Sequence, residues 1–313
     1  MLKLSSRVRI LDLDGSVTKQ LSLMSQLATP PQVIDLRHLA ASLRFMCTQR
    51  ARHQFESYLQ VTQRDHLTFY GSGDFHHLTA ALVAQWQTPI SLVVFDGHPD
   101  WDMTSPWHCC GCWVNEVLAQ PHIRKVVVIG LGGTDLHGWH VLRGNLKAIY
   151  QQKLELFPAR WQQSKTIFGA SAALPGVSMT RRWLKTNIRW QTVAQRSLPE
   201  IMHDVITRLP TRDVYLSIDK DCLTSDFAIT NWEEGELTLP TLCGAMQKLA
   251  KAKDIVGVDV IGEWSQGPIH NWLFRWLAKA DHPQQATPRT ADFKRNEQTN
   301  ITLYNALLEL NGS

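Results

Sequence analysis

The amino-acid sequence predicts an α/β protein built around a parallel sheet with helices on both faces. Short apolar runs alternate along most of the chain with segments whose apolar residues recur at spacings of three and four, as in helices. The apolar runs are continuous, which is typical of strands covered on both faces of a parallel sheet. Because no internal repeat or low-complexity linker interrupts this pattern, residues 1–313 are expected to form a single domain.

The composition is that of an ordinary globular protein. Hydrophobic residues make up 44% of the chain and charged residues 19%. The net charge is 32 − 28 = +4, and no Lys/Arg cluster is dense enough to predict a nucleic-acid partner. Residues 1–7 lack an apolar signal region, and no apolar run is long enough to cross a bilayer. The expectation is a cytoplasmic protein with no nucleic-acid and no membrane partner.

The first half of the chain alternates strands and helices. Apolar runs predict strands at residues 8–13, 67–70, 91–95 and 126–131. Apolar residues on one helical face predict helices at residues 36–46, from residue 78 onward, and at residues 113–119. The glycines of Gly71-Ser72-Gly73 allow a tight turn where the backbone crowds a site.

The second half continues the alternation with two less regular segments. Strands are predicted at residues 154–157, 214–218 and 255–261, and helices at residues 197–209, 239–249 and 303–310. Ser197 and Glu200 have the Ser-x-x-Glu form of a helix start. A basic, Trp-containing loop is expected at residues 181–190, and a polar surface excursion at residues 281–299.

The strongest functional signal is the run Asp96-Gly97-His98-Pro99-Asp100, which follows the predicted strand 91–95. Asp96, His98 and Asp100 stand at alternate positions, and alternate side chains of extended backbone point the same way. Two carboxylates and an imidazole would converge at the end of a buried strand, where like charges repel unless a cation lies among them. The pattern favours a divalent metal site over the alternative, a polar loop with a turn at the proline.

A second acidic pair, Asp219 and Asp221, follows the predicted strand 214–218, with Lys220 expected to point the opposite way. Sites in open parallel sheets lie beyond the carboxyl ends of the strands, so both clusters and a histidine of the Gly-rich turn can meet there. Four carboxylates and two imidazoles are too many for one four-coordinate zinc ion and suit two divalent ions, with Mn²⁺ a strong candidate. Two such ions can activate a shared water at neutral pH.

These stretches resemble the metal-binding motifs of the arginase/agmatinase ureohydrolase family. The family motifs are Asp-Ala-His-x-Asp, Ser-x-Asp-x-Asp and Gly-Gly-Asp-His-Ser, matched here by Asp96-Gly97-His98-Pro99-Asp100, Ser217-Ile218-Asp219-Lys220-Asp221 and Gly73-Asp74-Phe75-His76-His77. The resemblance covers residues 67–265. It implies a three-layer α/β/α fold with a mostly parallel, doubly wound sheet, two Mn²⁺ ions, and assembly into a homo-oligomer. The implied reaction is hydrolysis of a C–N bond in a guanidino or related amidine compound, giving urea or an amide plus an amine.

The resemblance also implies roles for individual residues. The metal ligands would be His76, Asp96, His98, Asp100, Asp219 and Asp221. His77 stays open as an alternative to His76, because Asp74-Phe75 stand where the family has Gly-Asp. Asp100 would bridge the two metal ions and also pass a proton to the departing amine. His108 is a candidate shuttle of protons to solvent, since an imidazole titrates near neutrality.

Two further carboxylates are candidates for binding the substrate. The family has a glutamate after its last core strand that grips the guanidinium; here Gly262 stands at that spacing and Glu263 one position later. A carboxylate can make paired hydrogen bonds to a guanidinium. Asp135, in a stretch similar to the family's Gly-Leu-Arg-Asp loop, could bind a substrate amino group, or could be a solvated turn residue. The expected partner is a small guanidino-type molecule.

The run His108-Cys109-Cys110-Gly111-Cys112 looks like a soft-metal cluster, yet zinc sites usually pair two such knuckles and the sequence has no second one. The six cysteines are not spaced as a disulfide framework, so reduced thiols near the pocket are expected. Several of the twelve tryptophans lie near the motifs and could line a pocket for an apolar or cationic substrate.

Two alternatives to a guanidino hydrolase stay open. One is a related metal-dependent amidohydrolase, such as a deacetylase-like enzyme with one zinc ion. That enzyme would not need Asp221 or His76, and their presence disfavours it. The other is a non-catalytic metal-binding protein of the same fold. The complete set of metal-ligand residues disfavours this alternative.

Overall fold

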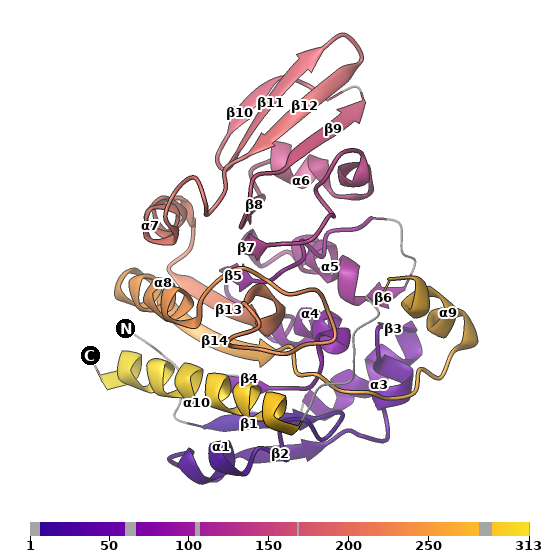
Figure 1. The fold of residues 1–313 in the computed structure, drawn as a ribbon, viewed down its shortest axis with the longest axis vertical. Coiled ribbons are helices and arrows are strands. Elements are labelled where there is room, and N and C mark those ends of the chain that lie inside the picture. Colours follow the sequence, from indigo (N-terminus) through magenta and orange to yellow (C-terminus); the bar gives the residue numbers. More distant parts are fainter. Residues whose placement is uncertain (1–6, 60–66, 104–106, 168, 282–289, 313) are drawn as a thin grey trace.

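Eight parallel strands form the central sheet, in the order β2-β1-β4-β14-β13-β5-β7-β8 (Figure 1). The computed structural model describes residues 7–59, 67–103, 107–167, 169–281 and 290–312. The strands are β1 (Val8–Asp12), β2 (Gln32–Asp35), β4 (Leu67–Phe69), β5 (Ile90–Phe95), β7 (Ile123–Leu131), β8 (Leu154–Pro158), β13 (Asp213–Asp219) and β14 (Asp254–Ile261). All seven pairings are parallel, so every strand ends at the same edge of the sheet.

Helices cover both faces of this sheet and give the protein three layers. Alternate residues of the strands belong to two separate apolar cores, as in β5, where Leu92 and Val94 face one core and Val93 and Phe95 the other. The first core is completed by α3 (Gln49–Leu59), α4 (Thr79–Val83), α5 (Trp113–Ala119) and α6 (Leu146–Tyr150). The second is completed by α1 (Leu21–Gln26), α7 (Leu198–Arg208), α8 (Leu239–Ala252) and α10 (Thr290–Gly312). The three-layer α/β/α prediction is confirmed.

A second, antiparallel sheet projects from one end of the molecule (Figure 1). Its strands are β9 (Gln163–Ile167), β10 (Ala172–Leu174), β11 (Val177–Arg182) and β12 (Lys185–Trp190). The expectation of a loop at residues 181–190 is therefore wrong. The loop between β11 and β12 is Trp183-Leu184, which lacks the Gly, Asn or Asp residues that mark a hairpin in a sequence.

Two predicted helices have different bounds in the structure. Of the helix expected at residues 36–46, only the short α2 (Ala40–Leu43) forms, and Met46 instead belongs to β3 (Met46–Cys47), which pairs with β6 (His108–Cys109). The last helix, α10, begins at Thr290 rather than 303, so residues 290–299 of the expected surface excursion are helical, and residues 282–289 lie outside the described residues. The remaining described helix, α9, spans Trp272–Asp281. Among the described residues, no helix is long and apolar enough to span a membrane.

Candidate metal centre

The motif residues meet at the carboxyl edge of the central sheet. Asp96 follows β5, Asp219 ends β13, and Asp221 lies in the 3₁₀ helix η4 (Lys220–Cys222) directly after it. His76 comes from the 3₁₀ helix η1 (Gly73–Leu78), which follows β4. These residues line one pocket, which is also lined by Gly73, His98, Pro99, Asp100, Trp101, Asp102, Cys110, Gly111, Thr134, Asp135, Arg143, Trp232 and Glu233.

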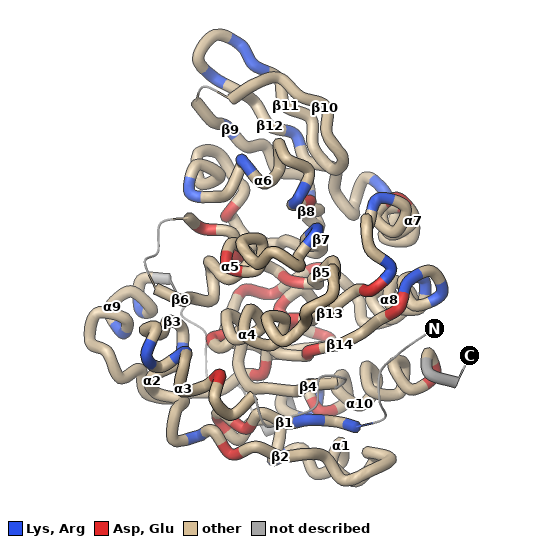
Figure 2. Tube along the Cα trace, turned by 180° about the vertical axis from the view of Figure 1, so that it is seen from behind, with Lys and Arg blue, Asp and Glu red and all other residues tan. Residues whose placement is uncertain are grey.

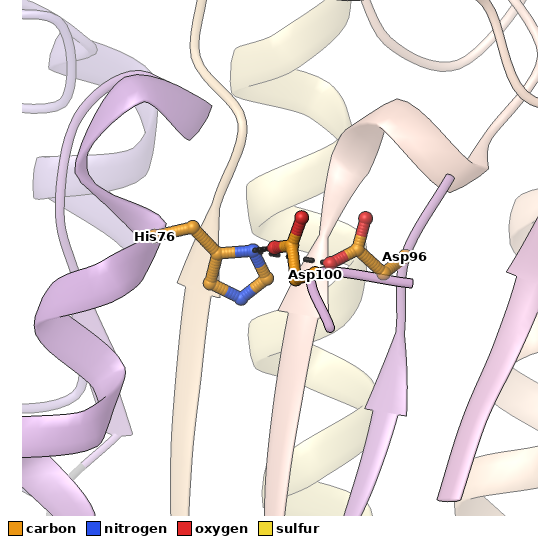
Figure 3. A group of neighbouring side chains, drawn as sticks. All are labelled: His76, Asp96 and Asp100. Carbon is orange, nitrogen blue, oxygen red and sulfur yellow. Dashed lines mark ion pairs between the residues drawn. The ribbon is translucent and has the colours of Figure 1, made fainter. Parts of the chain in front are cut away.

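One group of candidate ligands surrounds the Nδ1 atom of His76 (Figure 3). This nitrogen lies 3.2 Å from Asp96 Oδ2, 3.3 Å from Asp219 Oδ2 and 3.5 Å from Asp100 Oδ2. All four side chains are buried. His76, Asp96 and Asp100 have donor atoms close enough together to bind one ion.

A second group shares Asp96 with the first. Asp96, His98 and Asp221 also have donor atoms close enough for one ion, and His98 Nδ1 lies 2.9 Å from Asp221 Oδ2. The other oxygen of Asp221 accepts a hydrogen bond from the Gly97 backbone N–H at 2.8 Å. A Cβ atom at Gly97 would lie 3.1 Å from that oxygen, tighter than most Cβ contacts, so the glycine permits this approach. The two groups are thus candidate ligand sets that share Asp96 rather than Asp100, the residue expected to bridge.

The metal-free site is electrostatically unfavourable. Burial raises the pKa of Asp96 and of Asp219 well above the usual range, and the neighbouring Asp221 charge adds to both shifts. Burial, followed by the Asp96 charge, raises the pKa of Asp100. Burial alone would lower the pKa of His98 and raise that of Asp221, but their mutual attraction reverses both shifts. Such crowding of carboxylates is what bound cations relieve.

The residues present fit a pair of divalent cations. Asp96 Oδ2 is buried and accepts no hydrogen bond from the described residues, and His76 Nδ1 lies 3.2 Å from it. Carboxylate and imidazole donors in this ratio suit ions such as Mn²⁺ rather than a thiolate-bound soft metal. The two candidate ligand groups share the Asp96 carboxylate.

Supporting residues hold the candidate ligands from behind. The Nε2 atom of His76 lies 3.0 Å from Ser217 Oγ, which donates to Asp259 at 2.6 Å. The indole N–H of Trp113 donates to Asp100 Oδ2 at 2.6 Å, and its ring lies 4.6 Å from that of His76. Asp100 has φ +46°, a strained region for a non-glycine residue, and strain of this kind gathers at functional sites. Sequence reasoning missed the role of Trp113, because its only signal was a helical pattern.

The structure separates the two adjacent histidines. Asp74, where the sequence departs from the family motif, forms a 2.7 Å ion pair with buried Arg44 and so anchors η1. In this helix His76 points at the carboxylates, whereas neither ring nitrogen of His77 has a hydrogen-bond partner among the described residues. Burial and the nearby Arg52 charge lower the pKa of His77. The geometry favours His76 as the candidate ligand.

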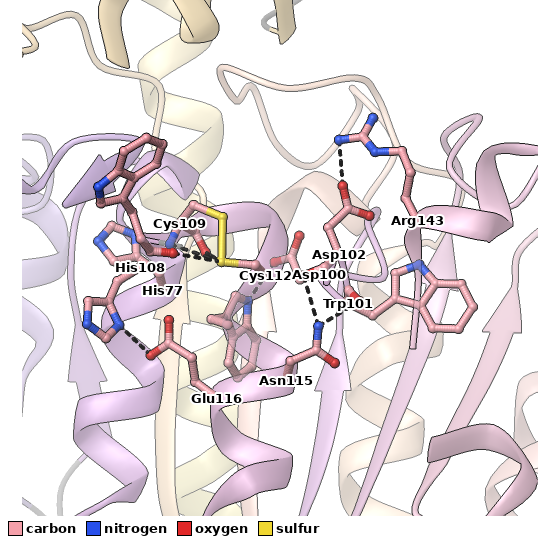
Figure 4. Close-up of a disulfide and its surroundings, with 12 residues drawn as sticks. His77, Asp100, Trp101, Asp102, His108, Cys109, Cys112, Asn115, Glu116 and Arg143 are labelled. Atoms are coloured by element: carbon pink, nitrogen blue, oxygen red, sulfur yellow. Dashed lines mark hydrogen bonds and ion pairs between the residues drawn. A yellow bond between two sulfur atoms is a disulfide. The ribbon is translucent and has the colours of Figure 1, made fainter. Parts of the chain in front are cut away.

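His108 does not line the pocket. Its ring contacts Glu116 at 2.8 Å (Figure 4) and Gln49 at 2.7 Å. The β3–β6 pairing fixes this side chain next to Cys47 instead of the carboxylates. Its position therefore gives no support to the expected proton shuttle.

The cysteine-rich turn differs from the expectation in one respect. Cys109 and Cys112 form a disulfide, so the prediction of reduced thiols is wrong for this pair (Figure 4). The spacing of two intervening residues lets the 3₁₀ turn bring the two sulfur atoms together. Cys47, Cys110, Cys222 and Cys243 are not in disulfides. Of the three clustered cysteines, only Cys110 lines the pocket.

Glu263 faces away from the pocket. The backbone at Gly262 has φ +89°, and a Cβ there would lie 2.3 Å from Asp219 Oδ1, so no glutamate fits at the family's position. Glu263 is buried against Lys220 Nζ and accepts hydrogen bonds from Asn296 at 2.9 Å and Asn300 at 2.7 Å. Its carboxylate is therefore occupied inside the protein. Lys220 points toward Glu263 and does not line the pocket with the candidate metal ligands, as expected.

The remaining candidates lie in the part of the pocket wall formed by Trp101, Asp102, Asp135, Arg143, Trp232 and Glu233, here called the outer wall. Asp135 lines it, as does Glu233, which sequence reasoning did not identify. The side chains of Trp101 and Trp232 contribute aromatic surface, in keeping with the suggestion that tryptophans line a pocket. Arg143 and Asp102 form a 2.6 Å ion pair at the same wall. Nothing in the local sequence distinguished Glu233 or Arg143 from ordinary surface charges.

Comparisons with known proteins agree with this architecture. No protein-family model matches the chain. An uncharacterised protein of Thermotoga maritima is 26% identical over 215 residues, which are 69% of this chain and 64% of that protein, so the match spans less than two thirds of the relative's length.

Solved structures with the same fold include arginases, an agmatine ureohydrolase and a formimidoylglutamase. Arginase of Entamoeba histolytica in complex with L-ornithine has a TM-score of 0.58 at 11% identity, covering 97% of this chain and 99% of that one. Formimidoylglutamase of Bacillus subtilis has a TM-score of 0.56 at 11% identity (98% and 87% covered), and agmatine ureohydrolase of Thermoplasma volcanium has 0.51 at 12% identity (97% and 92% covered). The chain therefore has the fold of arginases, agmatinases and formimidoylglutamases, as its motifs implied.

Proposed function

We propose that this protein is a binuclear metal-dependent hydrolase that cleaves a C–N bond of a guanidino, amidine or formimino compound. The observation that carries the proposal is the pair of ligand groups that share Asp96 in one buried pocket. The fold it has in common with arginase, agmatine ureohydrolase and formimidoylglutamase supports the same class of reaction.

The residues present can hold two ions and leave one side of the pocket for a substrate. His76, Asp96, Asp100 and Asp219 would hold one ion, and Asp96, His98 and Asp221 the other. When bound, the two ions would activate water and polarise the substrate carbon. Two ions, with Mn²⁺ the first candidate, therefore form part of the proposal.

Asp100 is the residue best placed to move a proton. It lines the pocket beside the first ligand group, and the Trp113 N–H holds its carboxyl group in place, where it can accept a proton and pass it to the departing amine. An amine must be protonated to leave as a neutral product, and a carboxylate at hydrogen-bond distance can supply that proton.

Substrate selection is assigned to the outer wall. Asp135 could accept hydrogen bonds from a polar or cationic end of the substrate. Glu263 is not proposed as a substrate contact, because its carboxylate is buried against Lys220. His108 is not proposed as a proton shuttle, because it does not line the pocket.

The proposal is tested by product release after loading with Mn²⁺. The panel holds arginine, agmatine, guanidinobutyrate, guanidinopropionate, guanidinoacetate and free guanidine, scored for urea, and formiminoglutamate, scored for formamide. Turnover of one compound is expected, and Asp221→Asn should abolish it. Asp226→Asn, which removes an exposed carboxylate outside the pocket, is the matched control.

The proposal would be contradicted if protein shown to bind two ions released no product from any compound of the panel. Retained activity in Asp221→Asn with one ion bound would point to a one-metal amidohydrolase.

A further inference from the structure

The antiparallel sheet that projects from the molecule is strongly basic. Residues 156–199 contain no Asp or Glu and seven Lys or Arg, so they contribute +7, and the rest of the chain 4 − 7 = −3. The basic residues are Arg160, Lys165, Arg181, Arg182, Lys185, Arg189 and Arg196. Figure 2 shows Lys and Arg without Asp or Glu along β11 and β12 at this end of the molecule. A charge this concentrated differs from the scattered basicity of an ordinary surface.

Most of these cations have no acidic partner among the residues that the structure describes. Arg160 pairs with Glu236 and Arg196 with Asp204, both at the base of the sheet. The other five form no ion pair with an acidic residue in the described parts of the chain, although Arg181 donates to the Trp183 carbonyl at 2.9 Å. The strand register places Arg182 directly opposite Lys185, and like charges in that arrangement are destabilising. An external anion would relieve this repulsion.

One face of the sheet turns its cations to solvent. Along β12, Thr186, Ile188 and Trp190 are buried while Lys185, Asn187 and Arg189 are exposed. In β9 the pairing places Lys165 beside Asn187, and Ile167 beside Lys185. Four cations from three neighbouring strands therefore share one exposed face: Lys165, Arg182, Lys185 and Arg189. Arg181 lies opposite Thr186 and belongs to the other face.

The tip of the β11–β12 hairpin is apolar. Trp183 is 89% exposed and Leu184 57% exposed, and Ile167 of the adjacent strand is 47% exposed. Trp183 also has φ +60°, at the first position of a two-residue turn where glycine is the usual residue. The turn thus holds a bulky indole in a conformation that favours glycine, and in water it gains no burial in return. Both features indicate that the tip contacts another molecule.

We infer that the β11–β12 hairpin docks onto an anionic phospholipid surface. Indole rings favour the membrane–water interface, and an adjoining ring of Lys and Arg attracts acidic headgroups. The aliphatic residues Leu184 and Ile167 favour a lipid partner over a nucleic acid. Single-stranded nucleic acid is bound by aromatic stacking and by charge, to which aliphatic side chains add little. The hairpin would insert its tip into the headgroup layer, with Arg182 and Lys185 at the phosphates. This inference replaces the sequence-based expectation of no membrane partner, and it is independent of the proposed hydrolase.

The test is co-sedimentation of the full-length protein with vesicles. Binding to phosphatidylcholine–phosphatidylserine vesicles, weak binding to pure phosphatidylcholine, and release by added salt are expected. Arg182→Glu/Lys185→Glu should lower the partition coefficient by about a hundredfold or more, because four units of charge change at the surface. Trp183→Gly/Leu184→Ser should lower it by about tenfold or more, because apolar burial is lost. Thermal unfolding checks that both variants fold.

The matched control is Arg50→Glu/Arg124→Glu, which changes net charge equally at exposed residues of α3 and β7. Its partition coefficient should stay within about threefold of the wild type, because charges away from the contact are screened. Equal binding by the wild type and the hairpin variants would overturn the inference. So would hairpin-dependent binding of a single-stranded oligonucleotide by protein that does not bind the vesicles.

Discussion

Trp113 holds two candidate ligands of the first group at once. Its N–H donates to Asp100, and its ring lies against that of His76. Residues that orient metal ligands in this way typically change metal affinity by about 10–100-fold when they are replaced. Trp113 is thus a positioning residue for the proposed centre rather than a group that touches the substrate.

Trp113→Phe should therefore weaken metal binding while the fold is retained, since an aromatic ring remains, although smaller than indole, and the N–H is lost. We expect the affinity for the more weakly held Mn²⁺ to fall by about 10–100-fold, measured by calorimetric titration and Mn²⁺ EPR. The control is Trp190→Phe, which also removes a buried indole donor, in this case to Ser164 at 2.7 Å. Equal metal affinity in both variants would show that Trp113 is merely structural.

Glu263 is expected to act on stability. Lys220 is completely buried, and Glu263 is its only acidic partner among the described residues. Glu263→Gln should lower the free energy of unfolding by about 3–5 kcal/mol, because it leaves a buried ammonium unpaired. Lys220→Met/Glu263→Met should recover part of the loss in urea denaturation. The exposed pair Arg37–Asp35 is the control, and Asp35→Asn should have a far smaller effect. If Glu263→Gln left the stability unchanged and raised the KM, Glu263 would instead be a substrate contact.

At the residue scale, the sequence allowed the prediction of contacts that depend on local spacing. Asp96, His98 and Asp100 follow β5, and the structure brings them together with Asp219 and Asp221 as expected. Glu263 could not be placed in this way, because the positive φ of Gly262 turns the chain after β14. His108 could not be placed either, since its position depends on pairing with a distant two-residue strand.

At the scale of elements, α7 shows a helix start that was readable in the sequence. The Ser197 hydroxyl accepts from the N3 backbone, and Glu200 accepts the Ser197 N–H at 3.1 Å, which forms the predicted capping box. Ser197→Ala should lower the free energy of unfolding by about 1 kcal/mol, because a backbone N–H loses its partner. Chemical denaturation measures the change, and Ser57→Ala, at an exposed site inside α3, is the comparison. A loss no greater than that of the comparison would mean that the box is not formed in solution.

The elements that escaped prediction lacked such signals. The β11–β12 hairpin has Trp-Leu in place of a turn sequence, and its exposed face carries Arg and Lys, so it looked like a loop. The start of α10 is polar and lacks the apolar periodicity that marks a helix. The continuous strands of the central sheet were predictable because burial on both faces leaves little choice of residue.

At the scale of the whole molecule, the metal-free protein should be less stable at higher pH. Burial and neighbouring charges raise the pKa of Asp96, Asp100 and Asp219, so the folded state binds protons that the unfolded state releases. Their contribution is full below the ordinary pKa of aspartate and is lost as pH rises through the raised values. His98, whose pKa is also raised, adds to this loss, and the lowered pKa of Asp221 opposes it.

Scanning calorimetry of chelator-treated protein measures this effect. The Tm is expected to fall between about pH 5 and about pH 8, and Mn²⁺ should raise the Tm most at the upper end, because binding displaces protons. Asp226→Asn serves as the control, since it removes a carboxylate outside the pocket. A Tm of the metal-free protein that rises across this interval would contradict the electrostatic account of the site.

The order of strands in the central sheet has a consequence for biosynthesis. β4 and β5 are consecutive strands of the sheet in sequence, yet β14 and β13 lie between them. The ribosome therefore synthesises His76, Asp96, His98 and Asp100 long before β13 and β14, the two strands that lie between β4 and β5. Until then the nascent chain carries unpaired strand edges, which are prone to wrong pairing, and only half of a metal centre. Capture of the second ion would then be among the last events of maturation, after translation has passed β14.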